Sequence, residues 1–205
     1  MKFDLKFSEL VQGSFSPGEL NLMMVMQVNC PGCFLYGIPE MINLFHHYKE
    51  SVSFFALSTA FEDFELNTLE NTKRLVEDGY VVGETKKAFL QRGHDRNPFA
   101  IPFTVMVDAM IEKEELHHPK FAEHVVGGRA ELVLAHEKDE WANSLTNYFN
   151  NFEKCGYTFA ANLLQGTPTF ILFDRHKEIL SAWFGHVRER AIAEKLNHAL
   201  STTTK

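Results

Sequence analysis

The sequence predicts an α/β fold in which a mixed β-sheet is flanked by helices. Near the N-terminus, apolar runs at residues 22–26 and 52–58 are separated by a helical apolar stripe. A strand, a helix and a strand in this order indicate a βαβ unit with parallel strands. Near the C-terminus, apolar runs at 169–173 and 179–184 are joined by a short turn and followed by another stripe, which indicates an antiparallel hairpin and a helix. The predicted order is therefore βαβ, a variable middle and ββα.

The composition is that of a soluble globular protein. Of the 205 residues, 45% are hydrophobic and 23% are charged, and 19 phenylalanines favour a thick aromatic core. The formal net charge of −7 offers no basic surface for nucleic acid or for an anionic membrane. We therefore expect a single domain over residues 1–205, with no nucleic-acid partner and no membrane partner.

The first quarter of the chain supplies the βαβ unit. Residues 1–21 are interpreted as an edge segment followed by a turn, and the run at 22–28 suits a strand buried on both faces of a sheet. The helix expected at 33–48 carries apolar residues at intervals of three and four. Pro39 is expected to kink this helix or to separate its first turns. The apolar stripe consists of Phe34, Ile38, Met41, Ile42, Phe45 and Tyr48.

Two helices and a strand are expected to follow. Asn67 is the predicted N-cap of the first helix, and Glu70 occupies the capping-box position. A second, short helix is predicted over residues 84–91. The apolar run at 101–107 is interpreted as a strand, with Pro102 near its start, where proline is tolerated.

The character of the chain changes from residue 108. Residues 108–165 are polar and mostly helical in pattern, and they are too few to bury an independent core comfortably. We interpret them as a helical insertion within the domain, with a long helix from about 139 to 155. After the hairpin, a helix is predicted over residues 188–200. The polar tail at 201–205 is expected to be disordered.

The motif with chemical meaning is Cys30-Pro31-Gly32-Cys33, at the point where a buried strand gives way to a helix. Free amides and the dipole at a helix N-terminus stabilise an anion, so a thiolate forms more readily there. We interpret Cys30 as the attacking cysteine and Cys33 as the resolving one. A metal half-site and a pair of inert buried cysteines are the alternatives. A zinc site needs four ligands, and Cys155 is the only other cysteine.

Other candidate chemistry is weaker. Glu62 and Asp63 follow the second strand and form a candidate proton relay for the resolving thiol, but we favour the interpretation of a solvated acidic loop. Cys155 is interpreted as a small buried apolar residue, with a third redox thiol as the alternative. The ten histidines show no His-x-x-x-His spacing, and no glycine-rich phosphate loop occurs. No metal and no cofactor are therefore predicted.

The location of the chain is predicted from its N-terminus. No apolar segment of signal-peptide length precedes Gly13, and no run reaches the length of a membrane span. We expect a cytoplasmic protein. In that compartment thiols are kept reduced, and a Cys-x-x-Cys pair is more often catalytic than structural.

Together with the element order, the motif and the segment Gly166-Thr167-Pro168-Thr169 before a strand resemble the thioredoxin-like superfamily. The acidic segment 61–68 and the two helices after it resemble its TlpA-like and peroxiredoxin-like branch. The resemblance covers roughly residues 20–110 and 157–200. It implies a thioredoxin-like fold in which Pro168 follows a cis peptide bond opposite the cysteines. It also implies substrate binding at Pro31, Gly32, Thr167 and Pro168.

The sequence departs from the family pattern in several places. Asn29 stands where thioredoxin has tryptophan, and the strand before the motif has Met24 and Met26 but no carboxylate. The buried acid that assists the resolving cysteine in thioredoxin is therefore missing from that strand. Gln27 precedes Cys30 where peroxiredoxins have threonine, which disfavours peroxidase activity.

Two functions of different classes follow. The first is a thiol–disulfide oxidoreductase, acting in the direction of reduction on a disulfide-containing protein or thiol substrate. Its electrons would come from a reductase or from glutathione. The alternative is a binding or redox-sensing module whose helical insertion docks a partner protein. The docking residues would be aromatic, namely Trp141, Tyr148, Phe149 and Phe152.

Overall fold

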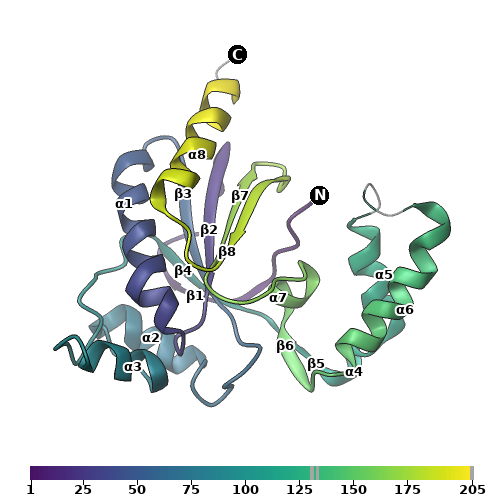
Figure 1. The fold of residues 1–205 in the computed structure, drawn as a ribbon, viewed down its shortest axis with the longest axis horizontal. Helices are drawn as coiled ribbons and strands as arrows, with labels where there is room; N and C mark the ends of the chain where they lie inside the picture. Colours follow the sequence, from purple (N-terminus) through teal and green to yellow (C-terminus); the bar gives the residue numbers. More distant parts are fainter. Residues whose placement is uncertain (130–131, 133, 204–205) are drawn as a thin grey trace.

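The centre of the molecule is a six-stranded mixed sheet (Figure 1). The computed structural model describes residues 1–129, 132 and 134–203. The strand order is β1-β4-β3-β2-β7-β8, with β2, β3 and β4 parallel to one another and the other pairings antiparallel. The strands are β1 (Phe7–Gln12), β2 (Leu20–Met26), β3 (Ser53–Ser58), β4 (Thr104–Asp108), β7 (Thr169–Asp174) and β8 (Ile179–Phe184).

Strand β2 lies in the middle of the sheet and is buried along its whole length. Its apolar side chains alternate between two cores, because successive residues of a strand point to opposite faces. Leu22 and Met24 belong to the core under the helices, whereas Met23 and Val25 belong to the core on the other face. The prediction of a strand buried on both faces is confirmed.

Two long helices, α1 (Ile38–Tyr48) and α8 (Glu189–Thr203), pack side by side on one face of the sheet (Figure 1). The five residues before α1, Cys33–Gly37, form a π-helical turn (η1). Pro39 has no amide hydrogen to donate to this turn, and it lies in the first turn of α1. Pro39 therefore marks the boundary between the π-helical turn η1 and α1, in agreement with the predicted separation of the first turns from the rest of the helix. On the opposite face, Phe3 of the N-terminal segment covers the sheet with 1% of its surface exposed.

Two predictions about helix ends are wrong. Residues 201–203 continue α8 and are not a disordered tail. The hydroxyls of Ser201 and Thr202 donate hydrogen bonds to backbone carbonyls near the end of the helix. Residues 204–205 lie outside the described part of the chain. The N-cap of α2 (Leu69–Asp78) is Thr68, whose Oγ1 accepts the Asn71 N–H at 3.1 Å. The side chain of Asn67 instead accepts the Asn29 N–H at 2.9 Å, beside the cysteine motif. The short helix α3 (Gly83–Leu90) follows α2.

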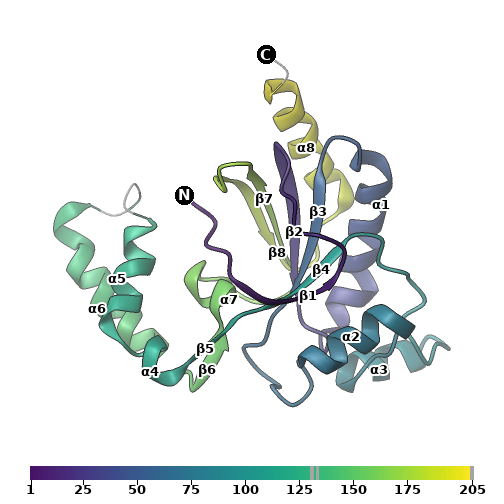
Figure 2. The same ribbon diagram turned by 180° about the vertical axis from the view of Figure 1, so that it is seen from behind.

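An arm built from residues 110–161 projects from the main sheet (Figures 1 and 2). It has an apolar core of its own, in which Phe121 and Phe149 meet edge to face at 5.0 Å. The N-terminal segment runs between the main sheet and this arm in both views. The elements are β5 (Met110–Glu112), α4 (Lys113–Leu116), α5 (Pro119–Gly127), η2 (Ala135–Glu137), α6 (Lys138–Phe149), β6 (Lys154–Gly156) and α7 (Tyr157–Ala161).

The long helix expected to run to residue 155 ends earlier. Helix α6 stops at Phe149, and Lys154–Gly156 forms strand β6, which pairs with β5 in a separate two-stranded sheet. Cys155 lies opposite Ile111 in this pair. The pairing satisfies backbone groups of residues 154–156 and leaves Cys155 in the arm core.

Candidate active site

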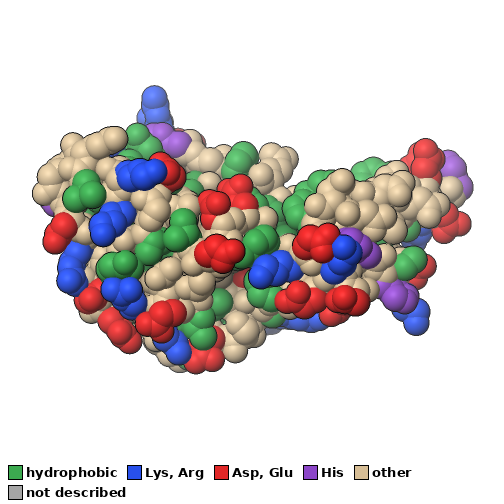
Figure 3. Space-filling view, turned by 90° about the horizontal axis from the view of Figure 1, so that it is seen from below, with side chains coloured by type: hydrophobic (Ala, Val, Ile, Leu, Met, Phe, Trp, Pro, Cys, Tyr) green, Lys and Arg blue, Asp and Glu red, His purple; other side chains and the backbone are tan. Residues whose placement is uncertain are grey.

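The two cysteines lie at the C-terminal end of the central strand. Strand β2 ends at Met26, and helical structure begins at Pro31, so residues 27–30 form the connection. Cys30 is partly exposed, whereas Cys33 is fully buried under the first helical turn. Figure 3 views the face on which the C-terminal ends of the parallel strands lie, and charged side chains of both signs are interspersed over it. Partial exposure leaves Cys30, and not Cys33, open to a partner sulfur.

Two hydrogen bonds with backbone groups hold the Cys30 sulfur. Its Sγ accepts a hydrogen bond from the Cys33 backbone N–H at 3.3 Å. As a thiol, it also donates to the Thr167 carbonyl oxygen at 3.4 Å. Because Thr167 lies far away in the sequence, the second contact joins the cysteine motif to the loop before β7. The two segments that the sequence singled out therefore meet in space.

The two thiols have opposite acidities. The hydrogen bond from the Cys33 side chain is the main cause that lowers the pKa of Cys30 to about 6, and it outweighs the opposing effect of burial. For Cys33, complete burial and the neighbouring Cys30 raise the pKa well above the usual 9.0. At neutral pH most of Cys30 is consequently a thiolate, while Cys33 stays protonated.

Pro168 packs directly against the cysteine motif. The Thr167–Pro168 peptide bond is cis. A Cβ on Gly32 would lie 3.6 Å from Pro168 Cδ and 4.0 Å from Cys30 Sγ. A Cβ on Gly37 would lie 3.3 Å from Pro168 Cβ and only 2.5 Å from Met24 Cε. Glycine at position 37 therefore allows the helix, the strand and the proline loop to approach one another closely.

Gln27 is a part of this site that sequence reasoning did not assign. Its side chain is 2% exposed and bridges two loops. The amide oxygen accepts from Thr167 Oγ1 at 3.3 Å, and the amide nitrogen donates to the Glu62 carbonyl at 3.3 Å. A glutamine between Met26 and Val28, in an otherwise apolar run, was the available signal. This neutral amide lies behind the cysteines, and within the described residues no carboxylate is hydrogen bonded to either sulfur.

The structure does not bring Glu62 or Asp63 into hydrogen-bond contact with the cysteines. Both side chains are exposed on the loop after β3. Asp63 Oδ2 accepts from Asn29 Nδ2 at 2.8 Å, and Asn29 Oδ1 accepts the Glu84 N–H at 2.7 Å. Asn29 thus ties the residue before Cys30 to two neighbouring loops, and Asp63 acts on the motif through Asn29.

Exposed aromatic residues border the cysteine motif on the side of β8. Tyr36 follows Cys33 by one helical turn, and its ring stacks on His186 with centroids 4.4 Å apart. Phe184 is 52% exposed, and its ring lies against Gly166 in the loop that carries Pro168. These contacts join residues far apart in the sequence, and the sequence analysis did not assign them. They give the surface beside Cys30 an apolar rim.

Cys155 lies in the arm core and differs from Cys30 in its exposure and in its pKa. It is 2% exposed, and burial raises its pKa to about 12. The prediction of a small buried apolar residue is confirmed. Among the described residues, no three His, Cys, Asp or Glu side chains are grouped to hold a metal ion. Within residues 1–129, 132 and 134–203, no helix combines the length and apolar character needed to cross a membrane.

Two solved structures resemble this one over nearly the whole chain. A thiol-disulfide isomerase from Corynebacterium glutamicum is 21% identical, with 98% of this chain and 96% of that chain covered and a TM-score of 0.59. A thioredoxin-like superfamily protein is 18% identical, with the same coverage and a TM-score of 0.58. No protein-family model and no curated protein sequence matches the chain. These likenesses show that the fold is thioredoxin-like, as the sequence predicted.

Proposed function

We propose that this chain, a thioredoxin-like fold, is a thiol–disulfide oxidoreductase that reduces protein or small-molecule disulfides through Cys30 and Cys33. The single observation that carries the proposal is the contrast between the two sulfurs. One is partly exposed and ionised, with a pKa of about 6, and the other is buried and protonated beside it. An inert buried pair would have two raised pKa values, because burial disfavours a thiolate.

The first step uses the exposed sulfur. The Cys30 thiolate attacks one sulfur of a substrate disulfide, and the S–S bond of the substrate breaks as the new bond forms. One half of the substrate leaves as a thiolate, and the other half stays bound to Cys30 as a mixed disulfide. The backbone N–H of Cys33, 3.3 Å from the attacking sulfur, holds that sulfur in place.

The second step uses the buried sulfur. Cys33 loses its proton to water and attacks Cys30 Sγ, and the S–S bond of the mixed disulfide breaks to release the second half of the substrate as a thiolate. Two electrons have then passed from the cysteine pair to the substrate, and Cys30 and Cys33 are joined. An electron-donating reductase or glutathione returns the pair to its dithiol form. Since the raised pKa of Cys33 opposes its deprotonation, resolution is the slower step.

Substrate binding falls to the surface around Cys30. The geometry supports a site formed by Pro31, Gly32, Thr167 and Pro168, because the loop of the last two lies against the motif. An extended substrate chain would lie along the Thr167 backbone. The rings of Tyr36 and Phe184 would contact apolar side chains next to the substrate cysteine.

The proposal is tested by reduction of oxidised glutathione and of a disulfide-containing protein, with dithiothreitol as the electron source. Cys30→Ser should abolish catalysis, and Cys33→Ser should accumulate a mixed disulfide that mass spectrometry detects. Cys155→Ser is the matched control and should keep the wild-type rate, because that sulfur is buried in the arm. Full activity in Cys30→Ser would overturn the proposal.

The second candidate, a partner-docking module, draws support from the arm. Trp141 is 44% exposed and Tyr148 is 45% exposed on α6, whereas Phe149 is 1% exposed and belongs to the arm core. In this account, residues 108–165 are an insertion into a single thioredoxin-like domain spanning 1–205. The double variant Trp141→Ser and Tyr148→Ser separates the candidates, because an enzyme of the proposed kind would keep its rate on oxidised glutathione. If the variant lost partner binding and Cys30→Ser did not, the docking function would be favoured.

A further inference from the structure

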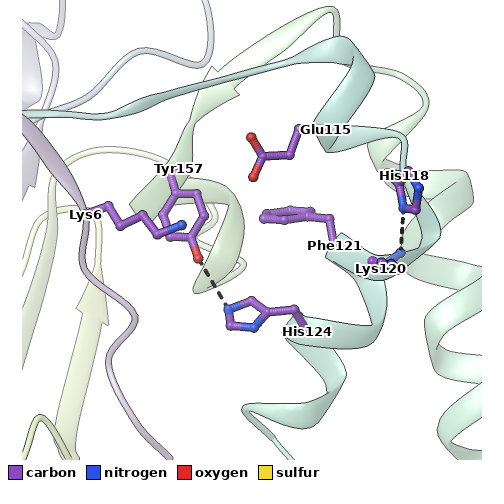
Figure 4. A pocket seen from close by; sticks show the side chains of 7 residues that line it. All are labelled: Lys6, Glu115, His118, Lys120, Phe121, His124 and Tyr157. Atoms are coloured by element: carbon purple, nitrogen blue, oxygen red, sulfur yellow. Dashed lines mark hydrogen bonds between the residues drawn. The ribbon is translucent and has the colours of Figure 1, made fainter.

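A cavity lies between the arm and the N-terminal segment, and it shares no lining residue with the cysteine site. Its volume is about 370 Å³, which falls within the range of small-molecule pockets. Figure 4 shows five of the lining side chains around one space, with His118 and Lys120 at its edge, at the start of α5. The lining residues are Lys6, Glu115, His118, Lys120, Phe121, His124 and Tyr157.

Hydrogen bonds and a ring contact hold the back wall of the cavity together. The Tyr157 hydroxyl donates to Asp4 Oδ2 at 3.1 Å, and His124 Nε2 lies 2.6 Å from the same carboxylate oxygen. The Phe121 ring meets the Tyr157 ring at 5.9 Å, and both residues are buried. This network fastens the N-terminal segment to α5. The wall therefore contributes aromatic surface, with the Asp4 carboxylate held behind it by Tyr157 and His124.

Two lysines line the mouth of the cavity. Lys6 Nζ lies 3.7 Å from the centroid of the Tyr157 ring, on one side of the space. His118 and Lys120 line the other side, from the start of α5. Glu115 is the one carboxylate in the lining, and the Asp4 carboxylate lies behind it against Tyr157 and His124. Within the described part of the chain, neither lysine forms an ion pair with a carboxylate.

We propose that this cavity binds a small organic anion through a carboxylate or phosphate group. Lys6 and Lys120 would contact the anionic group from opposite sides, by charge-assisted hydrogen bonds. His118 would add a donor through the ring nitrogen that is free of the Lys120 N–H, since its Nδ1 accepts that N–H at 3.2 Å. The apolar part of the ligand would lie against Phe121. The negative charge of Glu115 would weaken binding of the anion, so the Glu115→Gln variant is expected to bind it more tightly.

The test is a titration followed by amide NMR, with inorganic phosphate and succinate as probes and sodium chloride at matched ionic strength as the reference. We expect saturable shifts at residues 118–124 and 157. Lys6→Gln and Lys120→Gln should each weaken binding about tenfold, as expected for loss of a hydrogen bond between charged groups. Lys195→Gln, an exposed lysine on α8, is the matched control and should bind like the wild type. Glu115→Gln should bind more tightly.

Each outcome decides the proposal. Saturable binding of either probe that depends on Lys6 and Lys120 supports it, and the preferred probe identifies the class of anion. If neither probe gives saturable shifts, the proposal is wrong. It is also wrong if both lysine variants bind like the control, or if Glu115→Gln binds more weakly than the wild type. The readout does not involve the cysteines, so its result is independent of the proposed thiol chemistry.

Discussion

Replacing Cys33 with alanine should raise the pKa of Cys30. The pKa of Cys30 falls from 9.0 to about 6, which corresponds to about 4 kcal/mol in favour of the thiolate. The hydrogen bond from the Cys33 side chain is the largest cause. A hydrogen bond to a charged group contributes about 1.5–3 kcal/mol, or about one to two pKa units. In Cys33→Ala the pKa of Cys30 is therefore expected at about 7 to 8.

The measurement is the pH dependence of alkylation by iodoacetamide, resolved by mass spectrometry to the peptide that contains Cys30. The midpoint should move upward in Cys33→Ala. It should stay in place in Cys155→Ala, because that sulfur makes no contact with the site and belongs to the arm core. An unchanged midpoint in Cys33→Ala would show that the resolving thiol does not stabilise the Cys30 thiolate.

Two further predictions concern folding stability. Gly37→Ala should lower the free energy of unfolding by about 1–3 kcal/mol, because the added methyl group meets Met24 and Pro168. Gly127→Ala is the control, since a methyl group there meets nothing within 4 Å. Equal urea midpoints for the two variants would refute this prediction. Asp108 is buried, which raises its pKa from 3.8 to about 6, so its contribution to stability is full below pH 4 and is lost as the pH rises through 6. As the pH rises from 4 to 7, the free energy of unfolding of Asp108→Asn should therefore increase by about 3 kcal/mol relative to that of the wild type, as measured by urea unfolding. Parallel pH profiles of the two proteins would contradict this.

The sequence predicts the parts of the fold that leave a local pattern. The uninterrupted apolar run before Cys30 indicates a strand buried on both faces, and the stripe from Phe34 to Tyr48 indicates the helix that covers it. Pro39 marks the break between η1 and α1, because the missing amide hydrogen is a property of that residue alone. The role of the cysteine motif can be predicted for the same reason, because it depends on the strand and the helix directly beside it in the sequence.

Features formed by pairing of distant residues leave no such pattern. Strand β6 has three residues and lies beside β5 across a gap of more than forty positions. In the sequence alone, the helical periodicity of α6 therefore extends into the residues of β6. Gln27 is an isolated polar residue until Thr167 and the Glu62 carbonyl are placed beside it. The stack of Tyr36 on His186 and the cavity at Lys6 depend equally on tertiary contacts.

The reduction potential of the Cys30–Cys33 pair tests the central claim most directly. It is measured by equilibration in dithiothreitol or glutathione buffers, followed by alkylation and mass spectrometry. At pH 7, a Cys30 pKa of about 6 stabilises the dithiol form by about 1 kcal/mol more than a pKa of about 7, the thioredoxin value, and this corresponds to about 20 mV. We therefore predict a potential of about −250 mV, slightly above the value of about −270 mV for thioredoxin. A pair that forms no disulfide at any potential would contradict the proposed function.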